Sequence, residues 1–129
     1  MDPVTFPDTA TLVIDHLTEL LPTVDVAAPV YGQVPNPRPD EFIVVKRIGG
    51  PRRTAVSDGA HLWISVWASD DVRASDIAEI VRAVVHAMRG QVIGNVQVYR
   101  VDEHSFYEDP DPDSGNARYS FQSTVSVRG

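Results

Sequence analysis

The sequence contains no cysteine. A chain without thiols has no disulfides, no zinc–thiolate sites and no cysteine nucleophile. A length of 129 residues allows burial of roughly two thirds of the unfolded surface, so the fold needs no covalent or metal cross-link. This length fits one domain, which we expect to span residues 1–129.

Long apolar segments are also missing. No apolar run approaches the roughly 20 residues that a membrane-spanning helix needs. The N-terminal stretch MDPVTFPDTATL has no cationic head followed by an apolar core, so we expect no secretory signal. The sequence therefore predicts no membrane partner.

Positive charge is scarce, with a single lysine and a formal net charge of -7. Nucleic-acid-binding domains are usually basic, because neutralisation of phosphates supplies most of their affinity. The acidic balance argues against a free-standing domain of that class. With 22% charged and 43% apolar residues, the composition is that of a folded protein and not of a disordered one.

The signatures of common catalytic, nucleotide and metal sites are missing too. The stretch GGPRR, residues 49–53, lacks the Lys-Ser or Lys-Thr of a phosphate-binding loop and precedes a predicted strand. In DPDPDSG, residues 109–115, carboxylates alternate as in a calcium loop, but serines occupy the positions that require glycine and glutamate, namely Ser114 and Ser120. The four histidines are scattered, and no serine has a G-x-S-x-G context. We expect no enzymatic activity, no cofactor and no metal.

Two segments carry the period of an amphipathic helix. The first has its apolar stripe at Ala10, Val13, Ile14, Leu17, Leu20 and Leu21. In the second, the stripe is Ile77, Val81, Val84, Val85 and Met88, with Ile80 beside it. Asp8 caps the first helix and Pro22 stops it, whereas the second ends near Gly90. Its N-cap falls on one of three neighbours, Ser69, Asp70 or Asp71.

Five further segments are predicted strands, namely residues 25–31, 42–48, 60–68, 96–106 and 119–127. Pro29 confines the first to a sheet edge or a bulge, because proline cannot donate to a strand ladder. The order is α-β-β-β-α-β-β, an α+β fold with two helices packed on one face of a mainly antiparallel sheet. The predicted core includes Leu17, Ile64, Val81 and Val85.

The segment 60–68 is partly apolar on both faces. Ala60, Leu62, Ile64 and Val66 point one way, and His61, Trp63, Ser65 and Trp67 point the other. Tryptophan is enriched at interfaces because it combines a large apolar area with an indole N–H group that donates a hydrogen bond. The pattern leaves two alternatives: the chain itself covers the second face, or another subunit does.

About ten residues connect the strands 42–48 and 60–68, more than the usual two to five of a hairpin. Glycines at 49 and 50 and Pro51 fit a turn. Five of the eleven basic residues lie nearby, at Arg38, Lys46, Arg47, Arg52 and Arg53. Such a cluster is either a solvated tip or a loop that binds carboxylates of a partner through its arginines.

Four stretches of the sequence resemble a known family. They are VPNPRPDEFIVVKRIGGPRR (34–53), LWISVWA (62–68), SDIAEIVRAVVHAM (75–88) and DPDSGNARYSFQSTVSVRG (111–129). In these stretches and their order, the chain resembles the tail terminator proteins of long-tailed bacteriophages, particularly those that infect actinobacteria. The resemblance covers residues 6–129.

The resemblance implies a small α+β protein that forms a ring, typically a hexamer, on the end of the completed tail tube. Such a ring ends tube polymerisation and offers a surface to the head connector, with no enzymatic activity or cofactor. The implied partners are further copies of the chain, the tail tube protein and the head–tail connector protein, with DNA only passing through the ring lumen. The implied location is the virion tail at the head–tail junction, after assembly in the host cytoplasm.

Other neck, connector and tail-tube proteins have related folds, so the alternative is that this chain is one of those virion proteins. A nucleic-acid-binding or small-ligand-binding domain is a further alternative from another class. The predicted subunit or partner contacts are Gly49, Gly50, Pro51, Arg52, Arg53, Trp63, Trp67, Asp109, Asp111 and Asp113. We expect the basic tip and the acidic loop to pair in a head-to-tail ring contact.

Overall fold

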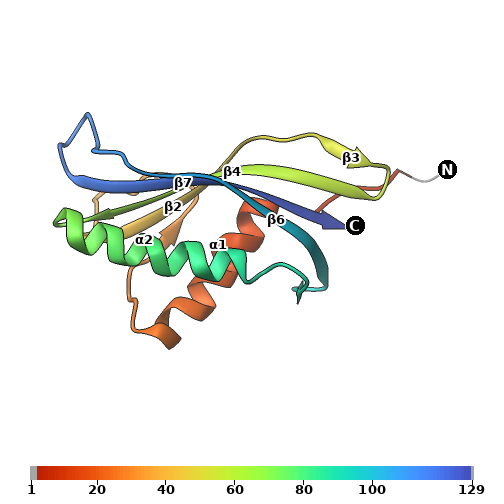
Figure 1. Cartoon of the computed structure of the whole chain (residues 1–129), viewed down its shortest axis with the longest axis horizontal. Coiled ribbons are helices and arrows are strands. Elements are labelled where there is room, and N and C mark those ends of the chain that lie inside the picture. Colours follow the sequence, from red (N-terminus) through yellow and green to blue (C-terminus); the bar gives the residue numbers. More distant parts are fainter. Residues whose placement is uncertain (1–2, 129) are drawn as a thin grey trace.

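The computed structural model describes residues 3–128, and it places two helices on one face of a seven-stranded sheet (Figure 1). The helices are α1 (Thr9–Leu20) and α2 (Asp71–His86), with a 3-10 turn at Leu21–Val24. The strands are β1 (Val30–Tyr31), β2 (Phe42–Gly49), β3 (Arg52–Thr54), β4 (Ser57–Ala68), β5 (Val92–Ile93), β6 (Val96–Glu108) and β7 (Ala117–Arg128). The predicted α+β class and element order are confirmed, and β3 and β5 are short additions.

The sheet runs in the order β1-β2-β4-β7-β6-β5, with β3 paired to β4. Every pairing is antiparallel except that of β1 with β2. Pro29 does precede an edge strand, and its carbonyl accepts a hydrogen bond from the Ile43 amide at 2.9 Å. Proline is tolerated there because its missing N–H lies outside the ladder.

The helix ends follow the capping rules. Asp8 accepts from the Thr11 amide at 3.2 Å and caps α1. Of the three candidates for the second cap, Asp70 is the one used, and it accepts from the Arg73 amide at 2.8 Å. Gly90 has the positive φ of a helix stop, +82°, but α2 ends earlier, at His86, and a turn fills the interval.

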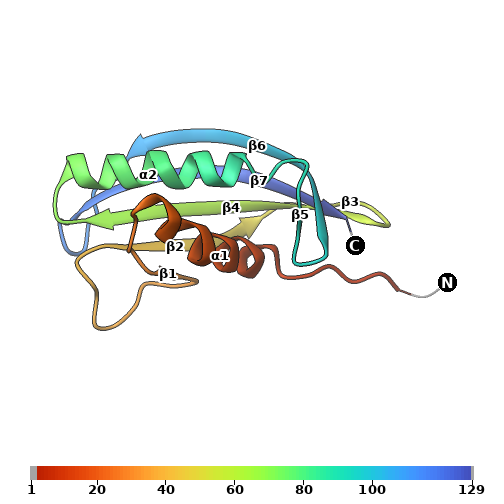
Figure 2. The same ribbon diagram turned by 90° about the horizontal axis from the view of Figure 1, so that it is seen from below.

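The main core lies between the helices and the sheet. Figure 2 looks onto the helices: α1 packs on β2, and α2 packs on β4, β6 and β7. The predicted core positions Leu17, Ile64, Val81 and Val85 are at most 1% exposed. They belong to the apolar stripes of α1, β4 and α2, so both predicted helix faces are confirmed.

A second apolar cluster lies on the other face of the sheet. Trp67 stacks on Phe42, with ring centroids 4.6 Å apart and an interplanar angle of 14°. Trp63 meets Trp67 edge-on at 6.0 Å, and Val44 completes the buried group. Trp67 is 1% exposed, whereas Trp63 is half-buried. The chain therefore covers one of these tryptophans by itself.

The long hairpin connection is itself paired. Arg52 lies opposite Asp58 and Thr54 opposite Ser57, so β3 folds back on an extended β4. Gly50 has φ +96°, and a Cβ there would collide with the carbonyl oxygen of Gly59. Only glycine permits this close approach of the two backbones. We call residues 49–58 the hairpin tip.

Candidate functional site

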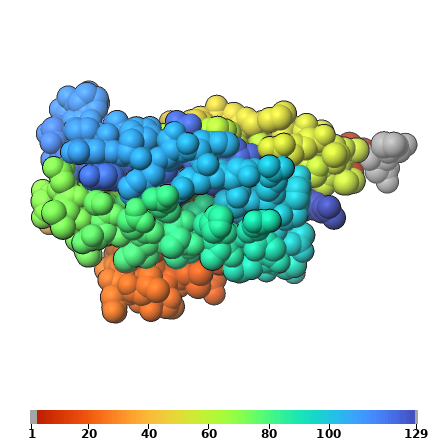
Figure 3. Space-filling model, viewed as in Figure 1, coloured from red at the N-terminus to blue at the C-terminus, as the bar shows by residue number. Residues whose placement is uncertain are grey.

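The predicted contact residues lie in three separate places. The hairpin tip and the loop of residues 109–116, which we call the acidic loop, project at opposite ends of the longest axis (Figures 1 and 3). Trp63 and Trp67 lie between them, on the sheet face away from the helices. Because the tip and the acidic loop do not meet within one chain, any pairing between them involves two copies.

Arg47 stabilises the turn at Gly49 and Gly50, where the GGPRR stretch begins. It donates to both Asp58 carboxylate oxygens, at 2.8 and 3.2 Å, and to the carbonyls of Gly49 and Gly50, at 3.0 and 2.8 Å. The hydrogen bond to Asp58 raises the pKa of Arg47 above its usual value. A phosphate cradle presents backbone N–H groups, but the carbonyls converge here on a cation. This geometry suits a structural turn and not an anion site.

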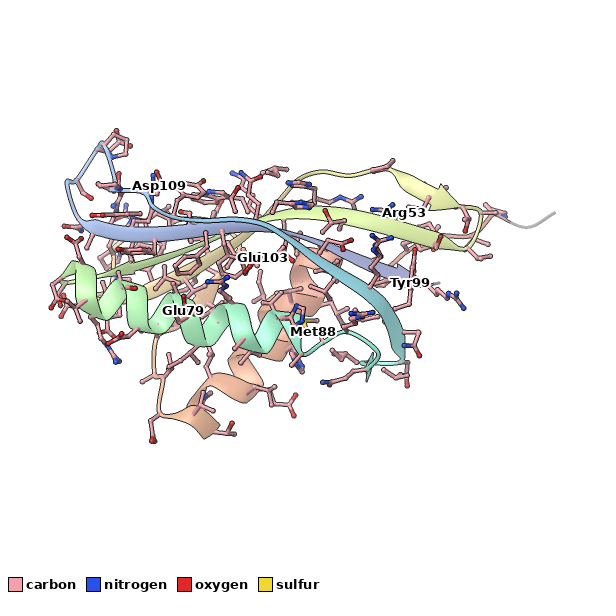
Figure 4. All side chains as sticks on the ribbon, viewed as in Figure 1. Arg53, Glu79, Met88, Tyr99, Glu103 and Asp109 are labelled. Carbon is pink, nitrogen blue, oxygen red and sulfur yellow. The ribbon has the colours of Figure 1, made fainter. Side chains whose placement is uncertain are left out.

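The adjacent arginines of the tip have different surroundings. Arg52 donates to the carbonyl of Val4 at 2.9 Å and that of Ala55 at 3.1 Å, and its guanidinium lies 4.5 Å from the centroid of the Phe6 ring. Arg52 thus ties the N-terminal segment to the hairpin tip. Arg53 lies across Gly59, where a Cβ would collide with its Nε atom (Figure 4). Arg53 is exposed, and it has no carboxylate partner among residues 3–128.

Two of the three aspartates in the acidic loop make internal contacts. Asp111 is 4% exposed and accepts from the Trp67 indole at 2.9 Å, from Arg38 at 2.7 Å and from the Asp113 amide at 2.9 Å. The indole hydrogen bond is the main cause that holds the pKa of Asp111 below its usual range. Asp109 accepts from the Ser120 hydroxyl at 2.9 Å. The side chain of Asp113 is exposed.

These contacts change the expected roles of the predicted residues. Asp111 and Trp67 are buried against each other, so they offer little surface to a partner. Among the predicted residues, those of the hairpin tip and Asp113 are exposed, and Trp63 is half-buried. Arg52 is exposed but already bound to the carbonyls of Val4 and Ala55. Sequence reasoning did not find the link from Arg38 to Asp111, because 73 residues separate the two. The proline-rich stretch around Arg38 was the only signal of a rigid segment.

The sheet face away from the helices is otherwise polar, and we call it the open face. On β4 it carries His61, Trp63 and Ser65, which lie opposite Thr124, Gln122 and Ser120 of β7. From β6, His104 stacks on His61, with ring centroids 4.8 Å apart and an interplanar angle of 4°. Both rings lie beside the Thr124 hydroxyl, at 2.7 Å from His104 Nε2 and 3.3 Å from His61 Nδ1. Two of the four scattered histidines thus form a pair.

Two carboxylates, Glu79 of α2 and Glu103 of β6, share one arginine (Figure 4). Arg82 lies between them, 2.9 Å from Glu79 and 2.7 Å from Glu103. Its guanidinium also lies 4.5 Å from the centroid of the Phe106 ring. The hydrogen bond to Glu103 raises the pKa of Arg82. Arg82 pairs with both carboxylates and offsets one of their two negative charges, as in a structural ion-pair network.

Within residues 3–128, no three His, Asp or Glu side chains are grouped so that they could hold a metal ion. Over the same residues, no helix is both long and apolar enough to cross a membrane.

Comparisons with known proteins show a likeness to solved structures. No family model matches the chain, and no curated protein matches it. Among solved structures, a chain from the virion of a native gene transfer agent particle has a similar fold, with a TM-score of 0.63 and 19% sequence identity. The match covers 91% of this chain and 92% of that one. At this identity the likeness shows a shared fold.

Proposed function

We propose that this protein is a structural component of a phage-like virion. The observation that carries the proposal is the fold shared with a chain of the gene transfer agent virion, over about nine tenths of both chains. A match of this extent covers most of the fold, and not only a common motif. Fold likeness alone is an analogy, so the proposal also depends on the sequence resemblance to tail terminators.

The specific role that we propose is that of a tail terminator. Copies of the chain form a ring, taken as a hexamer, that caps the tail tube, ends its polymerisation and joins it to the head connector. The partners are then the tail tube protein and the connector protein, while DNA only passes through the lumen. The location is the head–tail junction of the virion, after assembly in the host cytoplasm, with no membrane involved.

The arrangement of the contact residues supports an assembly role. The hairpin tip, with exposed Gly49, Gly50, Pro51 and Arg53, lies at one end of the long axis, and the acidic loop, which includes exposed Asp113, lies at the other. A surface with different groups at its two ends favours head-to-tail contacts, which close into rings when the rotation per subunit allows it. We propose that the whole chain, residues 1–129, acts as one such non-enzymatic domain without a cofactor.

The test is the behaviour of the purified protein, alone and with tail tubes. Light scattering should give a mass of several chains, and negative-stain images should show closed rings with a central hole. Mixed with tube protein during polymerisation, the rings should occupy tube ends and limit tube length. A monomer that leaves tube growth unchanged would refute the terminator role. Rings that bind isolated connectors but not tube ends would indicate that the chain is another protein of the neck.

A further inference from the structure

Charge is distributed unevenly over the two sides of the molecule. Residues 8–25, which comprise α1 and its flanks, contain four carboxylates and no lysine or arginine. All four are exposed, namely Asp8, Asp15, Glu19 and Asp25. The helices lie on one side of the sheet (Figure 1), so this acidic surface is turned away from the open face.

The open face carries the opposite charge. Lys46 of β2 lies beside Trp63, its direct partner on β4, and Arg53 lies over Gly59 two positions beyond His61. Within residues 3–128, neither cation has an ion-pair partner. Two further arginines on this face are neutralised, Arg100 by Asp102 and Arg118 by Asp109. Arg128 of β7, two positions beyond Ser126 on the same face, has no ion-pair partner among the described residues either. The open face thus has three unpaired cations in a protein of net charge -7.

We propose that the open face of one copy binds α1 of a second copy. Gly59 and Trp63 are four positions apart on β4, which sets Arg53 and Lys46 roughly 13 Å apart along the strand. On α1, Asp8 and Asp15 are about 10 Å apart along the axis, and Asp8 and Glu19 about 16 Å. One helix therefore has the length to bring a carboxylate to each of these two cations. This inference rests on the proposed ring, for which it names the contact.

The surface between these two cations suits a helix with short polar side chains. His104 offers the ring nitrogen that does not contact Thr124, Gln122 offers its amide N–H groups, and half-buried Trp63 offers an apolar plane. The outer side of α1 has Thr11 and Thr18 among its exposed residues, beside Asp15 and Glu19. Hydroxyls and carboxylates are acceptors for these groups. The acidic helix and the open face are thus complementary in charge and in hydrogen bonding.

The contact is heterologous, because each copy uses two different surfaces. α1 and the open face lie on opposite sides of the same sheet, so α1 cannot contact the open face of its own copy. A copy bound through its open face still presents its own α1 to a further copy. Repetition of one such contact gives a ring when the rotation closes and a filament when it does not.

The experiment is a charge swap between copies. Lys46→Glu with Arg53→Glu makes the open face acidic, and Asp15→Lys with Glu19→Lys makes α1 basic. Each variant alone should associate at least tenfold more weakly than the parent at low ionic strength, where charge is least screened. In an equimolar mixture every contact between unlike variants is complementary, so association should return. Alternation of the two variants closes a ring with an even number of subunits.

Light scattering and sedimentation velocity measure the association. The control is Arg89→Glu, which reverses an exposed charge that does not lie on the open face. Circular dichroism melts establish that each variant is folded. Rings that persist in both swapped variants would overturn this contact and leave the ring proposal standing. A parent protein without any association would overturn both. If Lys46→Glu with Arg53→Glu abolishes binding to a labelled DNA duplex and leaves association unchanged, the open face binds nucleic acid instead.

Discussion

The carboxylate of Asp111 accepts a hydrogen bond from the indole nitrogen of Trp67 at 2.9 Å. The two residues come from the acidic loop and from β4, 44 positions apart. Arg38 approaches the same carboxylate oxygen from a third segment, at 2.7 Å. This three-way contact closes one end of the open face and buries an aspartate that the sequence presents as part of a solvated loop.

Asp111→Ala should lower the free energy of unfolding by about 2–3 kcal/mol, because it leaves the Trp67 indole and Arg38 without their acceptor. Urea titration followed by tryptophan fluorescence measures this loss. The matched control is Asp113→Ala, which removes an exposed carboxylate two residues away and should cost less than about 0.5 kcal/mol. Equal losses for the two variants would contradict the structural role of Asp111.

The same carboxylate should make stability depend on pH. The pKa of Asp111 in the folded chain lies below its usual range, whereas the pKa of an aspartate in the unfolded chain is about 3.9. Between these two values the unfolded state binds more protons, so this contribution is complete above about pH 5 and is lost as the pH falls. The urea midpoint of the parent should therefore drop more steeply from pH 6 to pH 3 than that of Asp111→Asn. Parallel curves would contradict the lowered pKa.

Val85→Asp should unfold the protein at room temperature. Val85 is 1% exposed on the core side of α2, and an unpaired buried carboxylate costs several kcal/mol against a total of roughly 5–15 kcal/mol. Val72→Asp is the control, because Val72 lies on the same helix and is 71% exposed. Circular dichroism melts should show a cooperative transition for the control only. A parent-like melt of Val85→Asp would mean that the core face of α2 is misassigned.

Arg52→Glu with Arg53→Glu should leave the melting temperature nearly unchanged, because exposed ion pairs and cation contacts contribute only about 0–1 kcal/mol. The double reversal should weaken ring formation or tube capping, most visibly at low salt. The assays are light scattering and complementation of a phage that lacks the gene. Normal-length infectious tails from the double variant would make the hairpin tip an ordinary solvated turn.

The single variants should separate the two arginines. Arg52→Glu loses the hydrogen bond to Val4 and the contact with Phe6, so amide exchange in residues 4–6 should accelerate. Arg53→Glu should leave that exchange unchanged and should carry the loss of assembly. Hydrogen-exchange mass spectrometry of the N-terminal peptide measures the first effect. An equal response in both variants would contradict the division of roles.

Much of the fold follows from local patterns. The apolar period places Val81 and Val85 on the buried side of α2, and the alternation in β4 places Ile64 in the core. Asp8 and Asp70 cap their helices because a side-chain oxygen just before the first turn accepts from an unpaired amide. Pro29 marks an edge strand because it lacks a donor. Each of these features depends on residues that are close together in the sequence.

The contact surfaces depended on the tertiary structure. From the sequence, Asp109, Asp111 and Asp113 were equivalent, as were Arg52 and Arg53, because local charge carries no information about distant partners. Folding brings Trp67 and Arg38 to Asp111, Val4 to Arg52, and His104 to His61. Such contacts join segments far apart in the chain, so sheet order and register decide them. The sequence determined which segments become helices and strands, and only their packing decided which charges are neutralised and which stay exposed for a partner.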